Sequence, residues 1–273
     1  MVVQHNMQAM NANRQLGVTT DSQKKVTEKL SSGYKVNRAA DDAAGLTISE
    51  KMRSQIRGLT QASSNAQDGI SCVQTAEGAL AEVHSMLQRM NELAVKAANG
   101  TNTSADRTAI QKEVSALTSE ISRVAQSTQF NTLNLLNGSF AAGKKLQVGT
   151  ANVDAQRITI KISAMDASTL NVKNVDLSTE SGAQKAITAI TQAIARVSAQ
   201  RSDLGAVQNR LEHTIANLDN VVENTTAAES QIRDTDMAKT MVEYTKNNIL
   251  AQAGTSMLAQ ANQSTQNVLS LLG

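Results

Sequence analysis

The chain contains no proline and almost no aromatic residues. Its 273 residues include no Pro and no Trp, and only two Tyr and two Phe. Ordinary usage of about 5% would give roughly fourteen prolines. Proline interrupts helices because it lacks an amide hydrogen and its ring clashes with the preceding turn. A chain without it that is rich in Ala, Gln, Ser, Asn and Thr favours long helices, because a doubly wound α/β domain or an all-β domain would need more turn residues and more β-branched and aromatic side chains.

Other absences limit the possible partners. The formal net charge is only +2, which gives no strong field for nucleic acid, and the few aromatics offer no base-stacking platform. The single cysteine excludes an intramolecular disulfide. No apolar run reaches the ~18 residues that indicate a membrane span, and no basic region followed by an apolar core indicates a cleavable signal peptide. We therefore expect no nucleic-acid partner and no membrane insertion, and a protein that is cytoplasmic or exported without such a peptide.

Charge is also missing from both ends of the chain. Residues 1–13 and 247–273 contain no Asp, Glu, Lys or Arg. The second segment is too polar for a bilayer core, yet it carries too many apolar side chains for a solvated helix. An uncharged amphipathic helix is most stable when packed against another protein surface, so we interpret both ends as interaction segments; the alternative is a frayed polar tail. The large apolar residues of the second segment are Ile249, Leu250, Met257, Leu258, Val268, Leu269, Leu271 and Leu272.

Apolar residues recur at alternating steps of three and four in the middle of the chain. The pattern runs along residues 73–97 and again along 110–124, and it is typical of a coiled-coil seam. The dipeptide Asn99-Gly100 should end the first helix, and Thr103 with Asp106 should cap the second. The short connection between them predicts antiparallel neighbours.

A third seam predicts a helix over 185–228, roughly 65 Å long at ~1.5 Å per residue, which suits an elongated bundle. Arg201 interrupts this seam, either as an edge residue whose charge reaches solvent or as the partner of an acidic residue between subunits. Residues 145–162 alternate apolar and polar side chains and predict a β-hairpin, and 163–180 predicts a loop. The fold class is therefore mainly α, a long antiparallel helical bundle or coiled-coil rod with one small β-hairpin.

No combination of residues indicates catalysis, a metal site or a cofactor site. The three histidines have no second ligand at metal-binding spacing. Cys72 lies beside the first seam and is expected to be a buried small hydrophobe. The carboxylate pairs Asp41-Asp42 and Asp234-x-Asp236 are expected to cap helices. We therefore expect no enzyme. The residues leave three classes open, which are a self-assembling structural subunit, a coiled-coil signalling protein, and a secretion adapter or hook-junction protein.

Four sequence blocks resemble bacterial flagellins. They are Leu30–Leu46, Leu87–Val95, Gln129–Gly138 and Ala251–Leu272, which cover both halves of the chain in the order found in that family. The chain is thus similar to a short flagellin that lacks large outer domains. The alternative is the flagellar hook–filament junction protein, a relative whose tail is usually less similar to the last of these blocks.

The resemblance implies a self-assembling subunit of the flagellar filament, which gives motility. It implies that 1–43 and 231–273 form a terminal coiled-coil core domain, and that 44–230 form a helical domain with the hairpin near 145–162. It also implies type III export, an extracellular location in the flagellum, and three kinds of partner besides a second copy, namely an export chaperone, hook-junction proteins and cap proteins. The residues implied to contact the filament core or the chaperone are Ile249, Leu250, Leu258, Val268, Leu269 and Leu272.

The resemblance further implies recognition by host Toll-like receptor 5. The positions that match the receptor-contacting residues of the family are Gln88, Arg89, Leu93 and Glu113. An exposed arginine is a common anchor in protein interfaces. We expect packing between subunits to be the primary role of these residues.

Overall fold

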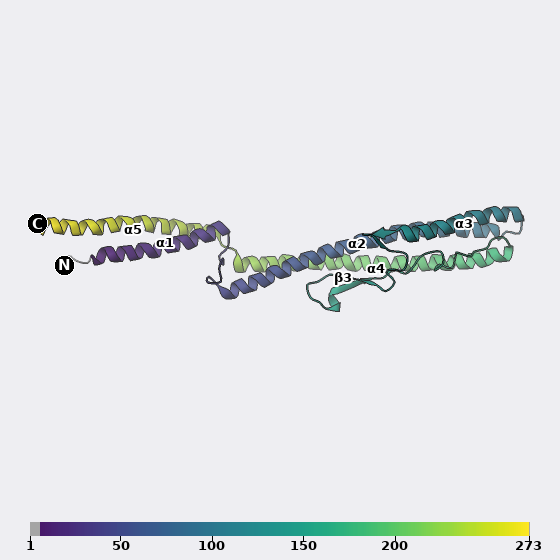
Figure 1. Ribbon diagram of the computed structural model, residues 1–273, viewed down its shortest axis with the longest axis horizontal. Coiled ribbons are helices and arrows are strands. Elements are labelled where there is room, and N and C mark those ends of the chain that lie inside the picture. The colour runs from purple at the N-terminus through teal and green to yellow at the C-terminus, as the bar shows by residue number, and fades with distance from the viewer. Residues whose placement is uncertain (1–5, 273) are drawn as a thin grey trace. The chain divides into compact units, whose positions relative to one another are not determined.

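The computed structural model describes residues 6–272, with side chains up to residue 264. Long helices dominate the described part of the chain (Figure 1), which confirms the expected helical bundle. The predicted hairpin is confirmed as well, and a second, smaller strand pair was missed. The helices are α1 (Met7–Ser32), α2 (Ala43–Ala97), α3 (Ser104–Ser127), α4 (Glu180–Arg233) and α5 (Met237–Leu272). The antiparallel strand pairs are β1 (Gln129–Phe130) with β2 (Leu133–Asn134), and β3 (Lys144–Gln147) with β4 (Arg157–Ile160).

The chain divides into two compact units. The first comprises residues 1–54 and 224–273, and the second comprises residues 55–223. The division expected from the sequence, 1–43 with 231–273 against 44–230, concerns the layers of an assembled filament and stays a prediction. Among the residues that the structure describes, no helix combines the length and hydropathy that a bilayer span requires.

The core of the second unit is built by the three predicted seams. On α2, Val73, Leu80 and Leu87 are fully buried. They share one apolar cluster with Ile121 of α3 and Ile190 of α4. A run of apolar residues at steps of three and four places one side chain per turn on the same helix face, which explains why these helices pack along their length.

Polar contacts fix the directions of these helices. Ser63 Oγ of α2 donates a hydrogen bond to Asp219 of α4 at 3.2 Å, and Arg201 of α4 lies 3.4 Å from Glu77 of α2. The later residue of α2 therefore contacts the earlier residue of α4, so the two helices run antiparallel. Arg201 has an acidic partner, as one alternative expected, but that partner belongs to the same chain.

The loop between β4 and α4 is irregular, as expected, yet it is part of the core. Met165, Leu170, Val172 and Leu177 are all at most 5% exposed and belong to the main apolar cluster. The polar residues between them face outward. The Ser-, Thr- and Asp-rich composition predicts a loop and gives no sign of this buried strip.

Close packing against α2 positions the β3–β4 hairpin. In the ladder, Leu146 lies opposite Ile158, and Ile158, Ile160 and Ile162 are buried on one face. Gly69 of α2 leaves the space that Leu146 occupies, because a Cβ at position 69 would lie 2.3 Å from Leu146 Cδ1. The glycine thus allows the hairpin to approach the helix.

The capping box expected at Thr103 is present, but only one member of each expected carboxylate pair caps a helix, because Asp41 and Asp234 accept hydrogen bonds elsewhere. Thr103 and Asp106 form a reciprocal capping box at the start of α3. Asp42 Oδ1 accepts a hydrogen bond from the Gly45 amide at 2.8 Å, and Asp236 Oδ1 accepts one from the Lys239 amide at 3.1 Å. Each carboxylate satisfies an amide that the first turn of its helix leaves without a partner.

In the first unit, α1 and α5 pair with each other. Asn6 Nδ2 donates to the Ala261 carbonyl at 2.9 Å, and the Thr235 amide donates to the Gly33 carbonyl at 2.9 Å. The two helices are therefore antiparallel, with the beginning of α1 beside the later part of α5 (Figure 1). Of their side chains up to residue 264, those below one-tenth exposed are Val26, Thr240 and Ala261.

Candidate interaction surfaces

The pair of α1 and α5 carries nine of the fifteen large apolar side chains that are exposed in the described part of the chain. Its large exposed apolar side chains are Met7, Met10, Val18, Met237, Met241, Val242, Ile249, Leu250 and Met257. Val242 is 69% exposed and Ile249 is 59% exposed. Contiguous exposed apolar surface is uncommon on a monomer and marks an interaction site. We call these nine residues the terminal apolar surface.

Two hollows lie on this surface. One is lined by Met241, Val242, Thr245, Lys246 and Ile249 of α5. The other lies between the two helices, and its lining residues, which include no charged side chain, are Gln8, Asn11, Ala12, Gln15, Gly254, Met257, Gln260, Ala261 and Ser264. A concave surface without charge can be covered by an apolar partner with no charge to desolvate.

The residues expected to contact the filament core or the chaperone fall partly on this surface. Ile249 and Leu250 are exposed on α5, and Leu258 is half-buried. Val268, Leu269 and Leu272 belong to the stretch whose side chains lie outside the described residues. The part that the structure describes therefore places the first two where a partner could reach them.

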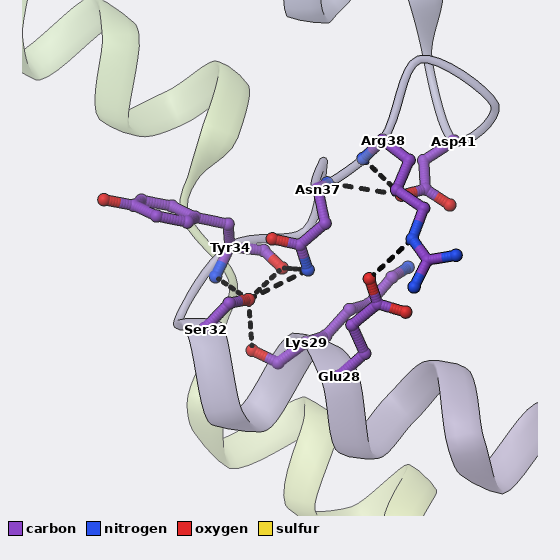
Figure 2. A network of polar contacts seen from close by, with 7 residues as sticks. All are labelled: Glu28, Lys29, Ser32, Tyr34, Asn37, Arg38 and Asp41. Carbon is purple, nitrogen blue, oxygen red and sulfur yellow. Dashed lines mark hydrogen bonds and ion pairs between the residues drawn. The ribbon is translucent and has the colours of Figure 1, made fainter.

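A dense polar network orders the segment that follows α1 (Figure 2). Ser32 Oγ accepts hydrogen bonds from the Tyr34 amide at 3.1 Å and from Asn37 Nδ2 at 2.9 Å. Asp41 accepts from the amides of Arg38 at 3.0 Å and Asn37 at 3.2 Å. These backbone hydrogen bonds hold the pKa of Asp41 below its ordinary value.

An ion pair ties this segment back to α1. Arg38 Nε lies 2.9 Å from Glu28 Oε1, and in Figure 2 the Arg38 side chain reaches down from the loop to the helix. The loop after α1 is thus closed on itself by Asp41 and fastened to the helix by Arg38. Neither contact was expected from the sequence, which had assigned Asp41 only to helix capping.

The connection between α4 and α5 lies beside this loop. Tyr34 and Asp234 form an isolated antiparallel bridge, and the Lys35 amide donates to the Arg233 carbonyl at 2.7 Å. The Arg233 guanidinium stacks 4.5 Å above the Tyr34 ring and also pairs with Glu50 at 3.1 Å. These contacts therefore hold the α1–α2 loop and the α4–α5 connection together, and we call this contact region the crossing. No short motif signalled it, because the partners are about two hundred residues apart.

The residues expected to contact the host receptor lie on α2 and α3 of the second unit. Arg89 pairs with Glu92 on its own helix and with Glu113 on α3, both at 3.0 Å. Hydrogen bonds to Glu92 and Glu113 raise the pKa of the Arg89 guanidinium. Gln88 is exposed next to this cluster, whereas Leu93 is only 3% exposed and belongs to the core. The structure thus brings Arg89 and Glu113 together at the surface and places Leu93 beneath it.

We next consider the side chains that could act as a nucleophile or bind a metal ion. Cys72 is 6% exposed, and burial raises the pKa of its thiol, which disfavours the nucleophilic thiolate. Among the described residues, no cluster of three or more His, Cys, Asp or Glu side chains could hold a metal ion.

Comparison with known proteins agrees with this picture. The bacterial flagellin N-terminal helical region matches residues 3–141, and the C-terminal helical region matches residues 187–272. The chain is 54% identical over 274 residues to a flagellin of Halalkalibacterium halodurans, covering 100% of both chains. It is 52% identical to the flagellar filament 31.3 kDa core protein of Treponema maltophilum, again covering 100% of both.

A solved structure shares the fold of part of the chain. The crystal structure of Bacillus cereus flagellin is 29% identical, covers 57% of this chain and 88% of its own, and superposes with a TM-score of 0.51. Two family regions flank the hairpin, and full-length relatives are about half identical, so the chain belongs to the bacterial flagellin family.

Proposed function

We propose that the chain is a structural subunit that polymerises into a bacterial flagellar filament and thereby serves motility. Family membership supports a role as a filament subunit, since relatives are named as flagellins and as core proteins of flagellar filaments. The observation that carries the proposal for this chain is the terminal apolar surface, on helices that bear no charge at their outer ends. Such a surface is stable only when other protein covers it.

The magnitude of this effect favours contacts with several neighbours. Burying a fully exposed Val, Leu, Ile or Met side chain contributes about 1.5–3 kcal/mol. Each of the nine residues is roughly half-exposed to two-thirds exposed, so each contributes on the order of 1 kcal/mol when it is covered. Association itself costs about 4–15 kcal/mol. The surface therefore compensates this cost only if most of it is buried at once, as in a helical array of copies.

The exposed apolar surface of the terminal helices suggests different roles for the two parts of the chain. Residues 1–43 and 231–273 form the filament core in our proposal, and 44–230 form the surrounding helical layer with the hairpin on it. The chain has no large outer domain, so the filament should be thin and smooth. The protein is exported to the cell exterior through the flagellar type III apparatus.

Partners other than a second copy follow from the same surface. An export chaperone would cover Ile249, Leu250 and Leu258 before assembly, because these side chains would otherwise promote premature association. Hook-junction and cap proteins would contact the first and last subunits of the filament. We propose these partners because of the family resemblance and because of the exposed apolar face of α5.

Host Toll-like receptor 5 is proposed as a partner of the second unit. Gln88, Arg89 and Glu113 are exposed and polar, and an exposed arginine held in place by two carboxylates is a suitable anchor for a protein partner. Leu93 would support this cluster from the core, since only 3% of it is exposed.

Electron microscopy of the purified chain tests the proposed function. Salting-out buffers strengthen apolar burial, so concentrating the chain in such a buffer should give long filaments. The variant Ile249→Gln should shift assembly to higher concentration, whereas Val153→Gln, which alters an exposed residue of the hairpin loop, should assemble like the wild type. A persistent monomer or a short capped oligomer would contradict the proposal and favour a hook–filament junction protein.

A further inference from the structure

The methionines of the described chain differ in exposure, and Met52 and Met86 are intermediate between the buried and the exposed ones. Met90 and Met165 of the second unit are 0% and 5% exposed. The large exposed methionines all lie on α1 and α5 and are between 49% and 66% exposed; they are Met7, Met10, Met237, Met241 and Met257. The terminal apolar surface therefore consists of methionine at five of its nine positions.

Methionine differs chemically from the aliphatic residues that could fill these positions. Its thioether is apolar and flexible and adapts to varied partner surfaces, but peroxides convert it to a sulfoxide, which is polar and chiral. Leucine would bury a similar volume without this reactivity. Exposure governs the reaction, because the oxidant must reach the sulfur.

We propose that these five methionines form an oxidation-sensitive modification site that controls the addition of free subunits to the filament. The sulfur lone pair attacks one oxygen of hydrogen peroxide, an S–O bond forms, and the O–O bond breaks. The sulfur is oxidised by two electrons, and the peroxide is reduced to one molecule of water. The inference rests on the proposed function, because it requires that this surface is covered by other copies.

The surroundings of these side chains explain why their oxidation would weaken assembly. Met241 shares a hollow with Val242 and Ile249, so a sulfoxide there places a strong dipole on an apolar contact face. Met257 lines the charge-free hollow between α1 and α5. Oxidation at either position removes apolar area that assembly would bury and adds a group that must lose its hydration.

Assembly should in turn protect these sulfurs. In a filament the terminal apolar surface is covered, so its methionines react more slowly than in the free subunit. Peroxide would then stop growth while existing filaments persist. A methionine sulfoxide reductase, which returns the sulfoxide to the thioether, would restore assembly.

The test compares the full chain before and after hydrogen peroxide. Free wild-type chain is treated, the peroxide is removed with catalase, and peptide mass spectrometry locates the sulfoxides. Sedimentation then measures the critical concentration for polymerisation. We expect sulfoxides at the five positions before Met90 or Met165, and a critical concentration raised at least about tenfold, equivalent to one lost apolar contact of moderate size. Reductase treatment should reverse both changes.

A variant with all five methionines replaced by leucine is the matched control. It should polymerise at a concentration close to that of the wild type and should not respond to the same peroxide treatment. The reductase experiment uses only the wild type, so it tests the inference even if the variant with five leucines assembles poorly.

Two results would overturn the inference. Oxidised wild type, with sulfoxides located at the five positions, could polymerise as well as untreated protein. Alternatively, the leucine variant could lose assembly to the same extent after peroxide, which would place the sensitive group elsewhere. Failure of the proposed function is distinct from both, because the untreated wild type would then form no filaments.

Discussion

Replacing Gly69 of α2 with alanine measures how closely the β3–β4 hairpin packs on that helix. Gly78 on the same helix provides a matched control, because a Cβ there would meet nothing within 4 Å. Alanine is favoured over glycine in a helix by about 1 kcal/mol, and this gain applies at both positions. The difference between the two variants therefore isolates the packing effect.

The structure sets the size of this difference. A Cβ at position 69 would lie 2.3 Å from Leu146 Cδ1 and 3.3 Å from Leu211 Cδ1. Carbon atoms pack best at about 3.5–4.0 Å, so the Leu146 methyl must move by more than ~1 Å. Leu146 packs against both apolar clusters of the second unit, so a shift of its methyl group disturbs both contacts. Overpacking of this kind costs about 1–3 kcal/mol.

We expect Gly78→Ala to raise the free energy of unfolding by up to about 1 kcal/mol and Gly69→Ala to fall about 1–3 kcal/mol below it. Urea unfolding followed by far-UV circular dichroism measures both. In a Leu146→Ala background the penalty at position 69 should disappear, because the clashing methyl is gone. Equal stabilisation by the two glycine substitutions would refute the close approach of hairpin and helix.

Four further outcomes are expected. Deleting 247–273 should abolish filaments in electron micrographs, and filaments of the truncated chain would contradict the assigned surface. Arg89→Ala should raise the dissociation constant for Toll-like receptor 5 at least about fivefold in a direct binding assay, and an unchanged constant would reject the receptor contact. Because the hydroxyl and amide of Thr103 lower the pKa of Asp106 in the folded chain, their contribution is complete at neutral pH and is lost as the pH falls through that lowered pKa. The stability deficit of Asp106→Ala should therefore shrink as the pH falls below the ordinary aspartate pKa of ~3.9. Leu87→Ala should lower the free energy of unfolding by about 2–5 kcal/mol because Leu87 is 0% exposed, and a change below ~1 kcal/mol in urea titration would show that the seam is not packed.

The long helices could be predicted because their signal repeats over many turns. The seam over 73–97 and the capping box at Thr103 each depend on residues close together in sequence, and the structure has both. Helix periodicity needs no knowledge of the partner helix. The same local character allowed the hairpin at 145–162 to be predicted from its alternation.

The second strand pair could not be predicted in this way. β1 and β2 have two residues each, which is too short for alternation to appear. Their turn places Asn131 at φ 46° and Thr132 at φ 64°. A β-branched residue rarely adopts this left-handed region, so Thr132 gave no turn signal.

The buried loop and the crossing in the first unit depend on contacts between distant residues. Buried side chains of the loop recur at steps of two and three, at Met165, Ala167, Leu170 and Val172, which matches neither a helix nor a strand. Arg233 reaches Tyr34 only because α1 and α5 pair in one register. A pairing register of this kind is a property of the folded chain and has no local sequence signal.

The unequal burial of the two units explains why folding and polymerisation should be linked in this chain. α1 and α5 are 26 and 36 residues long, yet among their side chains that the structure describes only a few are buried by the pairing. Most helical stability in proteins comes from tertiary packing, so we expect such a pair to gain the missing packing from neighbouring copies. Stability that depends on neighbours rises with subunit concentration. The absence of charge from 247–273 fits this arrangement, because every charge buried between subunits would cost desolvation energy that apolar contacts could not recover.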